Sequence, residues 1–205
     1  MLCGMTEPKI ALAVVHPGTV AYGWHESVLR TLRAFPGQFT IISVQCGVLI
    51  AGARNKVLDL FLESENDYLL STDSDIVWDP GAFQSLLEAD LPIVSAAYHG
   101  ATYNGKTFPV VSMRGEGSRL YRPEDFPVSD TPVEVFGVGM GFCLIKREVA
   151  EALAPVKELW PYAEVMYGPQ AIGEDITFCM RAAKKGYKTF LMPSVTVGHT
   201  KTMVV

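Results

Sequence analysis

The stretch Tyr68-Leu-Leu-Ser-Thr-Asp-Ser-Asp75 decides how the rest of the sequence is interpreted. Its apolar beginning, 68–72, has the length and composition of a buried β-strand, and two aspartates follow. In an extended segment residues i and i+2 point to the same side, so Asp73 and Asp75 are expected to face one point in space. Two carboxylates held that close repel each other unless a cation lies between them. A hard divalent metal ion, with a phosphate as its companion, is the predicted partner.

Capping of a turn is the alternative role for these two aspartates, because Asp is common after a strand. However, Asp79 is already placed to cap the next helix, with Pro80 at the first helical position. Asp73 and Asp75 are left without that role, and the pattern favours the metal site.

Strand and helix patterns alternate around this stretch. Strands are expected at 10–15, 39–44, 68–72 and 92–97, and helices at 24–35, 54–62 and from Asp79 onward. This alternation predicts an α/β fold with a mostly parallel sheet flanked by helices. Ligands of such sheets lie outside the carboxyl ends of the strands, where both the His16-Pro17-Gly18 segment and the aspartates are placed.

The second half of the chain has a different pattern, with shorter strands that form a smaller antiparallel part. Strands are expected at 107–113, 118–121, 133–136, 142–145, 188–192 and 195–199, helices at 146–153 and 174–185, a turn at 137–141 and a long loop at 155–172. No repeat or low-complexity linker separates the halves. A single domain over residues 1–205 is therefore predicted, with two halves at about 1–100 and 101–205.

Composition excludes several classes of function. Hydrophobic residues make up 49% and charged residues 19% of the 205 residues, and the formal net charge is −5. No basic block is present, so no nucleic-acid partner is expected. The four cysteines have no zinc-site spacing. The apolar run 10–15 is too short for a signal sequence or a membrane span, which predicts a cytoplasmic protein. A homo-oligomer is compatible with the sequence.

Gly173-Glu174-Asp175 opens a predicted helix and is the second candidate group. The helix dipole favours acidic residues in a first turn, and this explanation is as good as a functional one. The functional interpretation is a general base, because burial can raise the pKa of a carboxylate until it removes a hydroxyl proton.

Three further groups carry polar or flexible residues at suitable places. His199 is followed by Lys201 on the same side of a continuing strand, which suits a metal ligand beside a phosphate-binding lysine. Arg54 and Asn55 open a helix, either as a solvated helix start or as a polar hook for a base or ribose.

Glycines at 137, 139 and 141 form a G-x-G-x-G pattern. The spacing does not fit a dinucleotide-binding motif, and a strand rather than a helix follows. Close approach of the backbone to a bound sugar is the predicted use of Gly139 and Gly141.

Taken together, these segments resemble nucleotide-sugar glycosyltransferases of the GT-A fold, family-2 type, including compact bacterial and phage members. The matching segments are 53–56, 68–76, 138–146, 173–181 and 193–199. The resemblance implies a hexosyltransferase-like enzyme that moves a sugar from a UDP- or GDP-type nucleoside-diphosphate sugar to a hydroxyl of a glycan, protein or small-molecule acceptor. Residues 1–100 would bind the nucleotide, and residues 101–205 would bind the acceptor and carry the catalytic residues. A phage-encoded member would act in the host cytoplasm.

The resemblance also implies roles for the metal-site residues. Asp73, Ser74 and Asp75 match the D-x-D motif, which positions the ribose and binds Mn²⁺ or Mg²⁺ on the donor diphosphate. His199 matches the histidine that completes the metal site in many relatives, and Lys201 would neutralise phosphate.

The nucleobase pocket follows from the same resemblance. His16, Pro17 and Gly18 match the first-strand loop that cups the base, and Arg54 and Asn55 lie where that pocket continues.

Glu174 and Asp175 match the acidic pair that follows the acceptor loop, with Asp175 as the base of an inverting displacement. Aromatic residues at 160, 162 and 167 flank this pair and suit either sugar stacking or loop anchoring. Three alternatives stay open: a retaining glycosyltransferase, a nucleotidyltransferase that makes the nucleotide sugar, and a non-catalytic sugar-binding relative. The second usually has a basic residue in the first-strand loop, where this chain has none before Arg30. The third would not need both acids.

Overall fold

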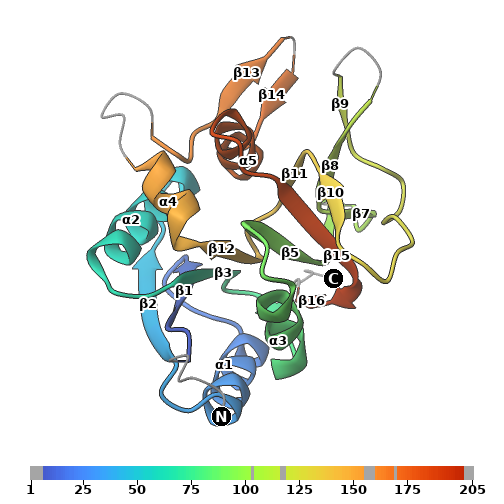
Figure 1. Ribbon diagram of the computed structural model, residues 1–205. Helices are drawn as coiled ribbons and strands as arrows, with labels where there is room; N and C mark the ends of the chain where they lie inside the picture. The colour runs from blue at the N-terminus through green and yellow to red at the C-terminus, as the bar shows by residue number, and fades with distance from the viewer. Residues whose placement is uncertain (1–6, 103, 116–118, 155–159, 169, 201–205) are drawn as a thin grey trace, which may run out of the picture.

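A seven-stranded sheet forms the centre of the computed structural model, which describes residues 7–102, 104–115, 119–154, 160–168 and 170–200. The strand order is β10-β15-β5-β12-β3-β1-β2 (Figure 1). These strands are β1 (Ile10–His16), β2 (Phe39–Gln45), β3 (Tyr68–Asp73), β5 (Ile93–Ala97), β10 (Val133–Val135), β12 (Phe142–Lys146) and β15 (Thr189–Thr196).

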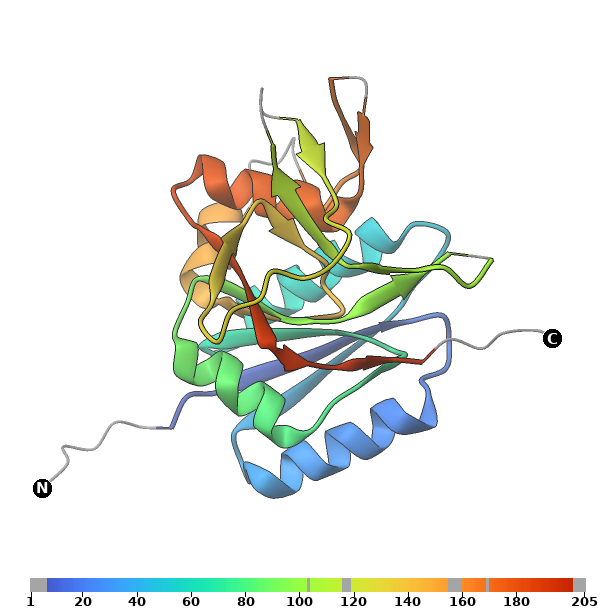
Figure 2. The same ribbon diagram turned by 90° about the vertical axis from the view of Figure 1, so that its right-hand side faces the viewer.

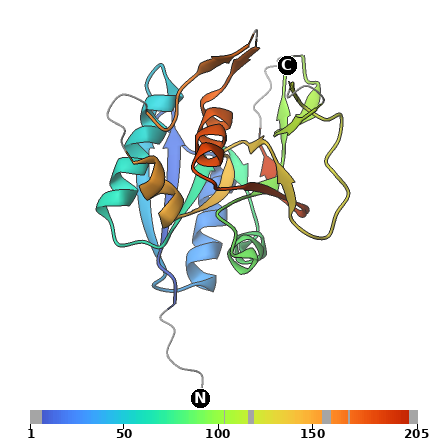
Figure 3. The same ribbon diagram turned by 45° about the horizontal axis from the view of Figure 1, so that its top comes forward.

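Helices cover both faces of this sheet (Figures 1 and 3). They are α1 (Tyr22–Ala34), α2 (Ile50–Glu63), α3 (Pro80–Ala89), α4 (Arg147–Leu153) and α5 (Glu174–Lys184). Helices α2, α4 and α5 bury apolar side chains in one core cluster, and α1 and α3 contribute to a second cluster on the other face. The central strands are buried on both sides, and mostly apolar, because both of their faces are covered. None of the described helices is long and apolar enough to span a membrane.

The strand directions confirm the predicted mostly parallel sheet. Strand β1 runs parallel to both β2 and β3, and β15 runs parallel to β5. Strand β12 comes from the second half of the chain and pairs antiparallel with β3 on one side and β5 on the other. The two halves of the sequence therefore share one sheet.

Small antiparallel sheets complete the fold, as the sequence predicts. Their strands are β4 (Ile76–Val77), β6 (His99–Ala101), β7 (Thr107–Pro109), β8 (Val111–Arg114), β9 (Leu120–Tyr121), β11 (Gly137–Val138), β13 (Val165–Tyr167), β14 (Gln170–Ile172) and β16 (Gly198–His199). The pairs β8–β9 and β13–β14 project from the same side of the main sheet (Figure 2). Strand β16 pairs with β4, which brings the end of the described chain to the turn after β3.

Several element boundaries differ from the sequence expectations. The predicted loop 155–172 contains the β13–β14 hairpin, whereas 155–159 lie outside the described residues. The predicted turn 137–141 begins as strand β11. Helix α2 begins at Ile50, so Arg54 and Asn55 lie in its second turn and are buried there instead of opening the helix. Asp79 caps α3 as predicted, accepting a hydrogen bond from the Gly81 amide at 3.0 Å.

Candidate active site

The two aspartates at the end of β3 have different partners. Strand β3 ends at Asp73, and Ser74 and Asp75 form a turn before β4, so the extended geometry behind the prediction that both carboxylates face one point is absent. Asp73 pairs with Arg54, and Asp75 pairs with His199, whose Nε2 lies 3.2 Å from Asp75 Oδ2. Within the described part of the chain, no three His, Cys, Asp or Glu side chains form a group that could hold a metal ion.

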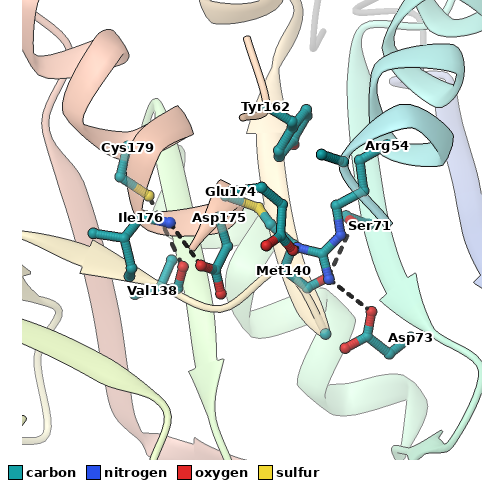
Figure 4. A network of polar contacts seen from close by, with 12 residues as sticks. Arg54, Ser71, Asp73, Val138, Met140, Tyr162, Glu174, Asp175, Ile176 and Cys179 are labelled. Carbon is teal, nitrogen blue, oxygen red and sulfur yellow. Dashed lines mark hydrogen bonds and ion pairs between the residues drawn. The ribbon is translucent and has the colours of Figure 1, made fainter. Parts of the chain in front are cut away.

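Arg54 links the end of β3 to the start of α5. Its side chain is only 6% exposed, and it projects from α2 between two carboxylates (Figure 4). Nη2 donates to Asp73 Oδ1 at 3.0 Å, and Nη1 lies 3.2 Å from Glu174 Oε1. Burial lowers the pKa of Arg54, but the negative charges of Asp73, Glu174 and Asp175 outweigh burial and raise it. A permanent positive charge is therefore held among three acids.

Asp175 lies beside this ion-pair network in the first turn of α5. Its Oδ1 accepts a hydrogen bond from the Ile176 amide at 2.7 Å (Figure 4). Burial raises the pKa of Asp175 to about 6, and the charge of Glu174 adds to this increase while Arg54 opposes it. A carboxylate with this pKa is mostly ionised at neutral pH and still accepts a proton readily, as a general base must.

One cavity collects most of these groups. It has a volume of about 240 Å³ and is lined by Arg54, Asp73, Asp175 and His199 on its polar side. Its other lining residues are Tyr98, Gly100, Ala101, Phe108, Val110 and Met140. The elements after β3, after β5 and at the start of α5 meet here, at the edge where ligands of parallel sheets bind. Two larger hollows, of about 610 and 510 Å³, lie away from these acids.

Tyr98 is a lining residue that the sequence did not single out. It directly follows the buried strand β5, and this position at a strand's carboxyl end is the signal that could have identified it. Burial raises the pKa of Tyr98 well above its ordinary value, so the hydroxyl stays protonated. Its oxygen accepts a hydrogen bond from the Gly141 amide at 2.9 Å, and its ring lies edge-on to His199.

Gly139 and Gly141 leave the space that the Tyr98 side chain occupies. A Cβ added at either position would lie less than 3 Å from the Tyr98 hydroxyl oxygen. The close backbone approach predicted for these glycines is thus made to Tyr98 within the protein, whereas the sequence interpretation assigned it to a bound sugar.

His199 has a geometry that fits a metal ligand. Its Nδ1 lies 2.9 Å from the carbonyl oxygen of His99, which can only accept, so Nδ1 carries a hydrogen. In a neutral ring Nε2 then directs a lone pair toward the Asp75 carboxylate. An imidazole lone pair and a carboxylate oxygen are donor types that a divalent cation binds, whereas with a hydrogen on Nε2 the same contact is an ion pair.

The residues predicted to hold the nucleobase are placed around the end of β1. His16 Nδ1 accepts a hydrogen bond from the Gly18 amide at 3.0 Å, so its Nε2 hydrogen points to Ser43 Oγ, also at 3.0 Å. Pro17 and Gly18 are exposed. The Ser74 carbonyl accepts a hydrogen bond from the Ala21 amide at 2.8 Å, which ties the turn after β3 to the start of α1.

Asn55 is engaged inside the protein. Its amide nitrogen donates to the carbonyl oxygens of Ala51 and Tyr162, both at 2.8 Å, and its Oδ1 accepts from the Tyr162 amide at 3.0 Å. Both amide hydrogens are thus used, and Asn55 does not line the cavity. In this structure it holds the loop before β13, and its contact with a base or ribose stays a prediction. Lys201 lies outside the described residues.

The aromatic residues near α5 have different environments. Tyr162 is buried and stacks on Phe178, with ring centroids 4.5 Å apart, so it anchors the loop in the core. Trp160 is 58% exposed and is available for contact with a ligand.

Comparison with known proteins shows which solved structures have a similar fold. No protein-family model matches the sequence, and no curated protein matches it. Among solved structures, A197 from STIV matches 95% of this chain and 86% of its own, with a TM-score of 0.59 and 23% identity. GalNAc-T7, solved with UDP, GalNAc and Mn²⁺, matches 96% of this chain with a TM-score of 0.58 and 11% identity. The fold is thus similar to that of GT-A glycosyltransferases. The chain spans 44% of the GalNAc-T7 chain, less than half its length.

Proposed function

We propose that this chain is a metal-dependent glycosyltransferase that moves a sugar from a nucleoside-diphosphate sugar to an acceptor hydroxyl. One observation carries the proposal: the cavity joins a carboxylate whose pKa is about 6, Asp175, to the Arg54–Asp73 ion pair at the end of β3. The GT-A-like fold supports it, because a structure of this fold contains UDP and Mn²⁺.

The proposed metal ligands are Asp75 and His199, which lie in contact. Asp73 is held by Arg54 in this structure and would have to leave that ion pair to become the third ligand. The 3.2 Å contact between the first two and the hydrogen on His199 Nδ1 fit this role. When bound, Mn²⁺ or Mg²⁺ would stabilise the negative charge that develops on the leaving diphosphate. Ser74 and Lys201 are proposed to contribute to phosphate binding, and His16, Pro17 and Gly18 to nucleobase binding.

Asp175 is proposed to accept the proton of the acceptor hydroxyl. The hydroxyl oxygen then forms a bond to the anomeric carbon while the bond to the diphosphate oxygen breaks. One displacement of this kind inverts the anomeric configuration. Tyr98 and Met140 form apolar parts of the wall beside Asp175 and reduce access of water to the reacting atoms.

Glu174 is proposed as a positioning residue and not as a second base. Its carboxylate lies 3.2 Å from Arg54 Nη1 and its side chain is only 12% exposed. This contact fixes the guanidinium that also holds Asp73. In this proposal Arg54 contributes to nucleotide binding only indirectly, because its guanidinium orients Asp73, the first aspartate of the D-x-D segment.

A thermal-shift panel of UDP- and GDP-sugars with Mn²⁺ tests the function. A selective increase in melting temperature that EDTA removes is expected, and NMR of the product from the selected donor then reports inversion or retention. Equal binding of the donor with and without metal, measured by calorimetry, would contradict the proposed metal role. No shift with any nucleotide sugar would contradict the proposed donor class.

A further inference from the structure

Strand β2 forms an open edge of the main sheet. It is the last strand in the order, and among the described residues no strand pairs with its outer side (Figure 1). Ile41, near its middle, is 50% exposed and belongs to neither core cluster. A hollow of about 610 Å³ follows the edge, lined by residues 40–43 of the strand, by Leu60 of α2 and by Ser64, which caps the end of that helix.

This edge lacks the features that usually prevent strand pairing. The twenty residues from 34 to 53 contain no Asp, Glu, Lys, Arg or His. At the chain's average of 19% charged residues, such a run would carry about four. Strand β2 itself has no proline, and its register with β1 is continuous over all seven residues, without a bulge. Charged residues, prolines and bulges are the common means by which edges avoid pairing.

The outward backbone groups of β2 can be assigned from its pairing with β1. Ile10 donates to the Gln38 carbonyl and Cys46 donates to the His16 carbonyl, which places the even-numbered residues of β2 toward β1. The amide and carbonyl groups of Phe39, Ile41, Ser43 and Gln45 therefore point outward.

The outward amide and carbonyl groups of β2 can pair with the same groups of a second copy of the strand. A two-fold axis through Ile42 would place Phe39 opposite Gln45 of a second copy and Ile41 opposite Ser43, in hydrogen-bonded antiparallel pairs. Every outward residue of the strand then has a partner. Residues near a two-fold axis lie beside their own copies, so any charge there would face a like charge. The uncharged strand avoids this repulsion.

The surroundings are compatible with the same arrangement. The charged pair of Lys9 and Glu65 borders the hollow at the amino end of the strand, with 3.7 Å between Nζ and Oε2, and Glu7 accepts a hydrogen bond from Gln38 just before the strand. In the dimer, the two-fold axis would place the two copies of the Lys9–Glu65 pair at opposite ends of the interface. The hollow beside Leu60 would receive the corresponding face of the partner's α2.

We propose that β2 is a homodimer interface, in which two copies of this chain join antiparallel at β2 around a two-fold axis through Ile42. The two main sheets become one continuous sheet. The candidate active site lies at other residues, so this inference does not depend on the proposed function.

Sedimentation equilibrium and light scattering on the full chain test the interface. The unchanged chain is expected to be a dimer. Ile41→Lys places two like charges close to the axis and should raise the dimer dissociation constant at least about tenfold. Val128→Lys, at a fully exposed apolar residue elsewhere, adds the same charge and should leave the dimer unchanged. Circular dichroism establishes that both variants fold.

Cysteine cross-linking tests the register. Ile42→Cys would lie opposite itself in a non-hydrogen-bonded pair and should form an intermolecular disulfide under mild oxidation. Ile41→Cys is offset from its own copy and should not. A monomer at all concentrations, a dimer that Ile41→Lys leaves intact, or cross-linking of Ile41→Cys in place of Ile42→Cys would each overturn the proposal. If another segment or another protein covers the outer side of β2, sedimentation of this chain would show a monomer.

Discussion

Asp175 shows how one residue can combine a chemical role with a cost in stability. Its side chain is half-buried beside Glu174, and Arg54 offsets part of the resulting penalty. Loss of its charge should therefore have opposite effects on transfer and on folding.

The first prediction concerns transfer. Asp175→Asn should bind the nucleotide-sugar donor normally but lose about 10²–10⁴-fold in turnover, because the amide cannot accept the hydroxyl proton. Calorimetry measures donor binding, and product formation measures turnover. Asp59→Asn, at an exposed carboxylate of α2, is the matched control and should retain full turnover. Normal transfer by Asp175→Asn would show that another group is the base.

The second prediction concerns pH. The folded-state pKa of Asp175, about 6, lies above its ordinary value of 3.8, so the folded state binds this proton more tightly. The stabilisation is complete below about pH 4 and is lost as the pH rises through about 6. Asp175→Asn should therefore match the unchanged protein near pH 4 and exceed its stability by about 1–3 kcal/mol at pH 7.5. Urea unfolding at both pH values measures the difference. A gain that is independent of pH would contradict this assignment.

At the scale of elements, the segment from β11 to β12 holds the cavity wall by a close contact. Tyr98, which follows β5, lies against the backbone of Gly139 and Gly141 and accepts a hydrogen bond from the second. Neither glycine needs a left-handed backbone, because their φ angles are not positive. Space for the tyrosine ring is the reason that they lack side chains.

The third prediction uses this contact. Gly139→Ala should displace Tyr98 from the cavity wall, lower the free energy of unfolding by about 1–3 kcal/mol and weaken donor binding. Gly52→Ala is the matched control, since a methyl group at this helical position meets nothing within 4 Å. It should raise stability by up to about 1 kcal/mol. Denaturant unfolding and donor-induced thermal shifts report the two effects. If Gly139→Ala leaves the free energy of unfolding unchanged, packing against Tyr98 is not the reason for a glycine at this position.

At the scale of the whole molecule, the candidate metal site depends on the pairing of distant segments. Strand β16 brings His199 to the turn after β3, and the Thr200 amide donates to the Asp75 carbonyl at 2.8 Å. The imidazole is oriented by the His99 carbonyl, after β5. Three separate parts of the chain thus position the contact between His199 and Asp75.

The fourth prediction follows from this pairing. His199→Ala should reduce Mn²⁺-dependent binding of UDP or GDP about 10–100-fold, because both the ligand and its orienting hydrogen bond are lost. Calorimetry with and without EDTA separates this effect from metal-independent binding. His25→Ala, at an exposed histidine of α1, should have no effect. If His199→Ala keeps the full dependence on Mn²⁺, the histidine is not a metal ligand.

The periodicity of the sequence was sufficient to predict the helices and strands of the first half and the mostly parallel sheet. The run 10–15 is apolar at every position and 93–97 has Ser95 as its single polar residue, and burial on both faces explains this pattern. The candidate acids could be found as well, because Asp73 ends a strand and Asp175 lies in the first turn of a helix, positions that local sequence defines.

Tertiary structure alone decided the partners of these residues. Arg54 and Asn55 are neighbours in α2, yet the first binds acids at the cavity and the second binds the backbone of Tyr162. Their separation depends on which way each side chain leaves the helix into a packed core. Asp73 and Asp75 likewise have different partners because the chain turns between them. Local sequence determines which segments become strands and helices, whereas long-range packing determines which side chains meet.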